Sequence, residues 1–217
     1  MKEYGETIFD ICYLLIAIVI GIYLLAKGKN KQGKLMGIAT LVLGLGDSFH
    51  LVPRMLDYFV DADFTAPLGI GKLITSITMT MFYIFMYYIY KENYKVEDNK
   101  IIKISIWLLA VIRMALCLLP QNKWFTNDGS VTIGIIRNIP FVIMGAIIIY
   151  LYFINRRKDK TFKNMWIYIL LSFLFYIPVV VGASSIPMLG MFMLPKTICY
   201  ILIIVLFKKK KTNELAD

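Results

Sequence analysis

Several ionisable residues of this 217-residue chain lie inside long apolar stretches, where a charged side chain is costly. In the stretch Gly46-Asp47-Ser48-Phe49-His50-Leu51-Val52-Pro53-Arg54, the residues Asp47, His50 and Arg54 are spaced by three and four positions. This spacing places them on one face of a helix. A carboxylate and an imidazole can act as acid and base, and a guanidinium can hold an anion. This face is therefore the first part of a candidate site.

Cations of the other apolar stretches extend this candidate site. They are Lys72, Arg113, Arg137 and Lys196, and Asn138 follows Arg137 directly. The carboxylates available in the same stretches are Asp47 and, closer to a helix end, Asp10. At least one cation therefore lacks a partner unless Lys196 is neutral or an external anion completes the set. Because Arg grips a carboxylate or phosphate through two parallel hydrogen bonds, we expect a site for an anionic ligand.

The elements that must position these residues are membrane-spanning helices. Apolar residues make up 59% of the chain and charged residues 18%, with a mean hydropathy of +0.70. A spanning helix needs about 20 mostly apolar residues. Seven segments satisfy this length and predict a single all-α domain, a polytopic membrane helix bundle: about 8–27, 34–54, 67–90, 101–119, 131–153, 164–183 and 187–207.

The connections between the predicted spans indicate the orientation of the bundle. Basic residues follow the first, fifth and seventh spans, in the segments 27–34, 156–163 and 208–211. Lys and Arg accumulate on the cytoplasmic side of a membrane. We therefore expect the N-terminus outside and the C-terminus in the cytoplasm of a multi-pass cell-membrane protein. The positive charge, +10 overall, is then a topology signal, and we expect membrane lipids rather than nucleic acid as partners.

The depth of the buried charges predicts that they meet. At 1.5 Å per residue, Asp47, Arg113 and Arg137 lie about 10 Å below the outer ends of their helices. His50 and Lys72 are shallower, and Lys196 lies near the middle of its span. We therefore expect Asp47, Arg113, Arg137 and Lys196 to converge on one cavity in the outer half. A plain structural pair of Asp47 with Arg113 or Arg137 is the alternative.

Three functions agree with such a site. We expect a binding or transport protein for an anionic metabolite or lipid head group, in which Asp47, His50, Lys72, Arg113, Arg137, Asn138 and Lys196 contact the ligand. The second interpretation is an intramembrane lipid hydrolase with Asp47, His50 or Lys196 as the catalytic group and both arginines stabilising negative charge. In the third, Lys196 resembles the Schiff-base lysine of retinal proteins, although Phe192 stands where microbial rhodopsins carry Asp.

The sequence predicts neither a metal centre nor a disulfide framework. His50 is the single histidine, and Cys12, Cys117 and Cys199 show no metal-ligand spacing. We expect no bound cofactor on these grounds. Nothing in the sequence predicts the oligomeric state.

Overall fold

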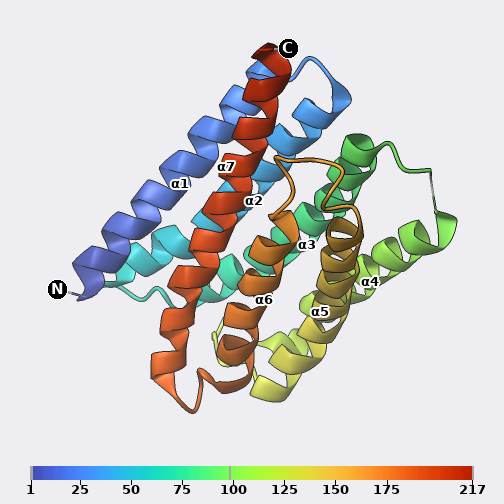
Figure 1. Cartoon of the computed structure of the whole chain (residues 1–217). Coiled ribbons are helices and arrows are strands. Elements are labelled where there is room, and N and C mark those ends of the chain that lie inside the picture. Colours follow the sequence, from blue (N-terminus) through green and yellow to red (C-terminus); the bar gives the residue numbers. More distant parts are fainter. Residues whose placement is uncertain (1, 98, 217) are drawn as a thin grey trace.

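The computed structural model describes residues 2–97 and 99–216, which are mostly helical. Within these residues there are seven long helices, and two short 3-10 helices lie in the connections (Figure 1). The elements are α1 (Lys2–Lys27), α2 (Lys31–Asp57), α3 (Thr65–Tyr94), α4 (Lys100–Leu118), η1 (Pro120–Asn122), α5 (Val131–Ile154), α6 (Met165–Gly182), η2 (Pro187–Phe192) and α7 (Met193–Ala216).

All seven long helices are long and apolar enough to cross a membrane, which confirms the predicted helix number and class. Most helices extend beyond the predicted spans, because backbone hydrogen bonding continues into the polar flanks. The start of the seventh helix is a correction. Pro187 opens the 3-10 helix η2 rather than α7, and Pro195 lies in the first turn of α7, where its missing N–H costs no hydrogen bond.

The helices form a closed ring in chain order (Figure 1). Each long helix packs against the next one along the chain, and α7 returns to pack against α1. Contacts of α3 with α5 and of α2 with α7 cross the ring. Every helix therefore presents one face to the interior and leaves another face for its surroundings.

Two glycines bring α2 and α3 into close contact. A Cβ atom on Gly46 would lie 2.0 Å from Oγ1 of Thr78, and one on Gly71 would lie 2.2 Å from the carbonyl oxygen of Phe49. Any larger residue would push the two helices apart. This close packing places His50 of α2 and Lys72 of α3 on the wall of one cavity.

The two ends of the bundle differ in charge. The N-terminus shares one end with the α2–α3, α4–α5 and α6–α7 connections, and the C-terminus shares the other with the remaining connections (Figure 1). The basic segments 27–34, 156–163 and 208–211 all belong to the C-terminal end. The ionisable residues of the candidate site lie toward the opposite, N-terminal end.

Asp159 ties the C-terminal end together. Its Oδ2 accepts a hydrogen bond from Lys210 Nζ at 2.8 Å, and its Oδ1 accepts the backbone N–H of Thr161 at 2.7 Å and of Phe162 at 3.2 Å. Burial alone would raise the pKa of this carboxyl, but the hydrogen bonds outweigh burial and lower the pKa below its ordinary value. The charged carboxylate therefore stabilises the folded state.

We predict that Asp159→Asn lowers the free energy of unfolding at pH 7 by about 1–3 kcal/mol, because an amide cannot replace the charge-assisted bonds. A lowered folded-state pKa stabilises the protein above the ordinary carboxyl pKa, and this contribution is lost as the pH falls through the folded-state value. The gap between wild type and variant should therefore narrow below about pH 4. Denaturant unfolding in detergent measures this stability difference, and Asp61→Asn, at an exposed position, is the control. A gap independent of pH would contradict this assignment.

Candidate ligand-binding site

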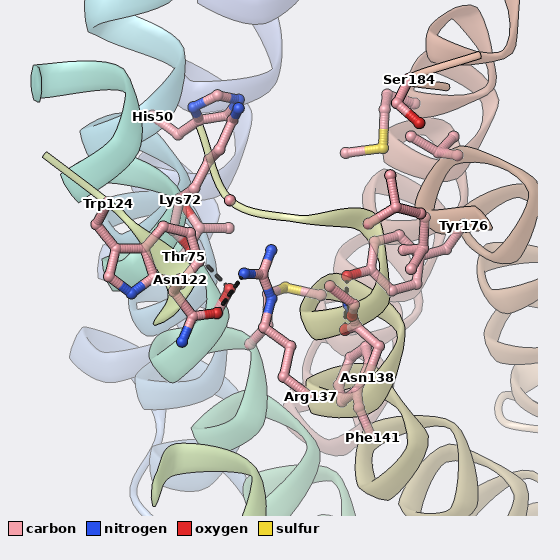
Figure 2. Close-up of a pocket in the computed structure, with 18 of the residues that line it drawn as sticks. His50, Lys72, Thr75, Asn122, Trp124, Arg137, Asn138, Phe141, Tyr176 and Ser184 are labelled. Atoms are coloured by element: carbon pink, nitrogen blue, oxygen red, sulfur yellow. Dashed lines mark hydrogen bonds between the residues drawn. The ribbon is translucent and has the colours of Figure 1, made fainter. Parts of the chain in front are cut away.

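A cavity of about 370 Å³ lies inside the N-terminal end of the bundle (Figure 2). Its walls come from all the long helices except α1, from η1 and η2, and from the loops that follow η1 and α6. The cations that line it are Arg54, Lys72, Arg113, Arg137 and Lys196. No Asp or Glu belongs to the described lining residues. We call this space the cationic cavity.

Three of these cations are oriented by neutral amides instead of carboxylates. Each donates a hydrogen bond to the side-chain oxygen of an asparagine. The pairs are Lys72 Nζ with Asn127 at 2.8 Å, Arg137 Nη1 with Asn122 at 2.6 Å and Arg113 Nη2 with Asn138 at 3.4 Å. An amide oxygen satisfies a donor and fixes its direction without neutralising the charge. The cations therefore keep their charge toward the cavity.

Arg113 is the most deeply buried of these cations. Its side chain is 2% exposed, and its guanidinium carbon lies 3.4 Å from the ring centroid of Phe141. The Nε and Nη1 atoms are buried and have no hydrogen-bond partner among the described residues. Buried charged donors normally find partners. Arg113 therefore has free hydrogen-bonding capacity at the wall of the cationic cavity.

Arg137 lies between the two walls of the cavity (Figure 2). Its side chain rises between Asn122 and Trp124 on one side and Asn138 and Tyr176 on the other. The guanidinium carbon is 4.4 Å from the Trp124 ring centroid, a cation–π contact that holds the side chain in place. One face of the guanidinium thus packs on an aromatic ring, and an in-plane edge bonds to Asn122.

The loop between α4 and α5 is held in place by buried hydrogen bonds, and it supplies both contacts of Arg137. Trp124 Nε1 donates to the carbonyl oxygen of Cys117 at 2.7 Å. A Cβ atom on Gly69 would lie 1.6 Å from the Trp124 carbonyl oxygen, so glycine is needed there for the loop to cross α3. Asn122 is 2% exposed. Its Nδ2 caps the end of α4 by donating to the carbonyl oxygens of Leu116, Cys117 and Leu119 at 2.8, 3.2 and 2.9 Å.

Lys196 is 7% exposed and lies between two tyrosines and a carboxylate. Its Nζ is 5.0 Å from the ring centroid of Tyr176 and 5.3 Å from that of Tyr200. It is also close enough to interact electrostatically with Asp47, although the two form no ion pair within 4.0 Å. Lys196 therefore has a distant counter-charge and no direct ionic partner among the described residues.

A second cavity of about 540 Å³ adjoins the first between α1, α2 and α7. Its carboxylates are Glu6, Asp10 and Asp47. Glu6 pairs with Arg54, and Asp47 accepts a hydrogen bond from the Tyr13 hydroxyl at 2.6 Å. The residues common to both cavities include His50, Arg54, Thr75 and Lys196. Acids and most cations therefore lie in separate compartments that meet at a shared wall.

The expected convergence of buried charges needs one correction. Arg113, Arg137 and Lys196 do line a single cavity, together with His50, Lys72 and Asn138. Asp47 does not, and it pairs with neither Arg113 nor Arg137, because α2 turns it toward Tyr13 and the second cavity. The alternative of an Asp47–Arg structural pair is therefore wrong.

The three candidate catalytic residues share a cavity but form no relay. Asp47, His50 and Lys196 all line the second cavity. No hydrogen bond joins any two of them, and the buried Nδ1 of His50 has no partner within the described part of the chain. The same part contains no group of three or more His, Cys, Asp or Glu side chains that could hold a metal ion, and the three cysteines are free.

Sequence reasoning missed the neutral half of the site. Asn122, Asn127 and Trp124 lie in the connection between α4 and α5, outside the predicted spans. Their side chains nevertheless orient Arg137 and Lys72. The hydroxyls of Ser76 and Thr80 on α3 donate to backbone carbonyls of their own helix. Asn138, directly after Arg137, was visible in the sequence, but its bond to Arg113 was not.

Comparisons with protein-family models, curated proteins and solved structures find no match for this chain. The fold defines its class as a bundle of seven helices that are long and apolar enough to span a membrane. Within that class, the side chains that line the two cavities are the basis for any functional proposal.

We predict that Asn122→Ala lowers the free energy of unfolding by about 2 kcal/mol or more. The variant leaves buried α4 carbonyls without their donor and Arg137 without its acceptor. Gln121→Ala, at the exposed neighbouring position, should change stability by less than about 0.5 kcal/mol. Thermal unfolding in the same detergent compares the two variants. Equal stability of Asn122→Ala and Gln121→Ala would mean that Asn122 does not organise the loop.

Proposed function

We propose that this protein is a multi-pass cell-membrane protein that binds or transports an anionic ligand in the cationic cavity. The observation that carries the proposal is the set of cations held by asparagine oxygens, in a cavity whose described lining has no carboxylate. A carboxylate or phosphate group of a metabolite or a lipid head group would be the missing counter-charge. Arg113 and Arg137 would be its main contacts.

The physical reason is the cost of burying charge. A buried ion without a partner costs several kcal/mol, and a structural role would favour a carboxylate partner over an amide. Hydrogen bonds between charged partners are about twice as strong as those between neutral ones. The Nε and Nη1 donors of Arg113 are buried and have no partner in the described part of the chain. They lie on different edges of the guanidinium, so each can donate one hydrogen bond to an anion. The cavity is therefore prepared for an anion before the ligand arrives.

The charge of the two ends supports an outward-facing cavity. The basic connections lie at the C-terminal end, so the positive-inside rule places that end in the cytoplasm. The cationic cavity then opens in the outer half of the membrane. Pro140 in α5 and Pro178 in α6 interrupt two helices of its wall, which would ease the rearrangement that transport needs.

An intramembrane lipid hydrolase is the second candidate. Asp47, His50 and Lys196 line one cavity next to the two arginines, which is the arrangement that an acid–base reaction on an anionic lipid would use. We favour binding, because no hydrogen bond connects these three groups. A retinal group on Lys196 receives less support, since Phe192 stands where microbial rhodopsins carry Asp.

We predict the orientation from cysteine accessibility. In a background without Cys12, Cys117 and Cys199, single cysteines near Asp61 and Asp128 should react with an impermeant maleimide applied to intact cells. Cysteines near Lys31 and Lys158 should react only after the membrane is opened. Labelling in the reverse pattern would place the cavity on the cytoplasmic side.

We predict that Arg113→Gln and Arg137→Gln abolish anion binding. Suitable probes are acetate, succinate and inorganic phosphate at constant ionic strength, and bilayers in which phosphatidylglycerol replaces part of the phosphatidylcholine. At a hundredfold excess over Kd, a ligand should raise the melting temperature of the wild type by about 5 °C or more. Neither variant should respond.

Without ligand, Arg113→Gln should melt at or above the wild-type temperature, because it removes a buried cation that lacks an ionic partner. Arg156→Gln, at the opposite end of the bundle, is the matched control and should respond to the anion as wild type does. Two results would contradict the proposal. In the first, none of these anions raises the melting temperature of the wild type. In the second, Arg113→Gln is strongly destabilised and an anion still raises its melting temperature.

A further inference from the structure

An apolar groove of about 220 Å³ runs along the outside of the bundle between α5 and α6. Four aliphatic side chains of its wall are well exposed, with exposed fractions between 38% for Ile177 and 53% for Val181. On α5 the groove extends from Ile135 to Ile143. At 1.5 Å per residue this is about 12 Å, close to the hydrocarbon depth of one leaflet.

The groove borders the cationic cavity. Asn138, Tyr176 and Val180 line both spaces. The Tyr176 hydroxyl donates to Asn138 Oδ1 at 2.8 Å, and Arg113 donates to the same oxygen at 3.4 Å. The contact of Tyr176 with Asn138 therefore separates the apolar groove from the most deeply buried cation.

A second apolar groove, between α4 and α5, lacks this connection. It has a volume of about 400 Å³, and its lining includes Ile101, Ile102, Ala146 and Leu151. None of its lining residues also lines the cationic cavity. Apolar grooves are thus an ordinary feature of this bundle. The α5–α6 groove differs from the α4–α5 groove because it shares lining residues with the cationic cavity.

We propose that the ligand is an anionic amphiphile with one hydrocarbon chain. This inference rests on the proposed function and narrows it. The carboxylate or phosphate head lies against Arg113 and Arg137, and the chain passes Tyr176 and Val180 into the α5–α6 groove. The ligand enters sideways from the membrane leaflet instead of from the aqueous phase.

The test compares anions with and without a chain. Wild type and variants are prepared in phosphatidylcholine nanodiscs and titrated with each anion separately. Inorganic phosphate is compared with octyl phosphate, and acetate is compared with octanoate. The quantity measured is the midpoint, the ligand concentration that gives half of the maximal shift in melting temperature. Octanol is the chain without the anion. Ile139→Trp fills the α5–α6 groove, and Val181→Trp fills it from the α6 side. Ala146→Trp fills the α4–α5 groove and is the matched control.

For the wild type we expect the octyl anions to act at lower concentration than their short partners, and octanol to have no effect. Ile139→Trp and Val181→Trp should raise the midpoint of the octyl anions about tenfold or more, which equals the loss of about two buried methylene groups. The short anions should keep their midpoint in both variants. Ala146→Trp should leave the midpoints of the octyl anions and of the short anions unchanged. Arg113→Gln should abolish the response to both kinds of anion.

Three results would overturn the inference, and they are distinguishable. If the groove variants leave the octyl midpoints unchanged while the short anions still bind, the proposed function stands and the ligand is a free anion. If octanol binds as well as octyl phosphate, the groove acts without the cationic cavity. If no anion of either length stabilises the wild type, the proposed function fails as well.

Discussion

Positive charge buried without an equal number of carboxylates is the constraint on which the rest of this structure depends. Arg113 is buried, Arg137 is partly buried and Lys72 is exposed, and all three line one cavity. Asparagine oxygens hold each of them, and aromatic rings also contact the two arginines. These partners fix direction and leave the charge in place. A folded state that keeps such charges in a low-dielectric interior is less stable than one with neutral side chains. The most economical explanation is that an anion from outside binds there.

The fold supports this arrangement by separating acids from cations. Glycines bring α2 against α3, and the α4–α5 loop folds over the end of the bundle, so that the cationic cavity is enclosed on several sides. Asp10, Asp47 and Glu6 lie in the neighbouring cavity. Lys196 and Arg54 belong to the wall between the two compartments. An anion bound in the cationic cavity would therefore contact Lys196 and Arg54, which also face the carboxylates of the second cavity.

Part of this picture could be predicted from the sequence. Length and apolar content define seven spans, and residue depth along each helix predicts that Arg113, Arg137 and Lys196 lie in the same half of the bundle, where they line one cavity. Depth does not determine which way a side chain turns around its helix, which is why Asp47 was assigned to the wrong cavity. The partners Asn122, Asn127 and Tyr176 come from separate elements, and only tertiary packing reveals such pairings. The start of α7 was misplaced because Pro187 and Pro195 both suit a first helical turn.

Native mass spectrometry of the protein released directly from its own membrane tests the central claim most directly. We expect a bound species whose fragmentation identifies an anionic group, and we expect it to be missing from Arg113→Gln and present in Arg156→Gln prepared in the same way. A wild-type protein that carries no anionic molecule, or an Arg113→Gln variant that carries the same molecule in the same amount, would contradict the account.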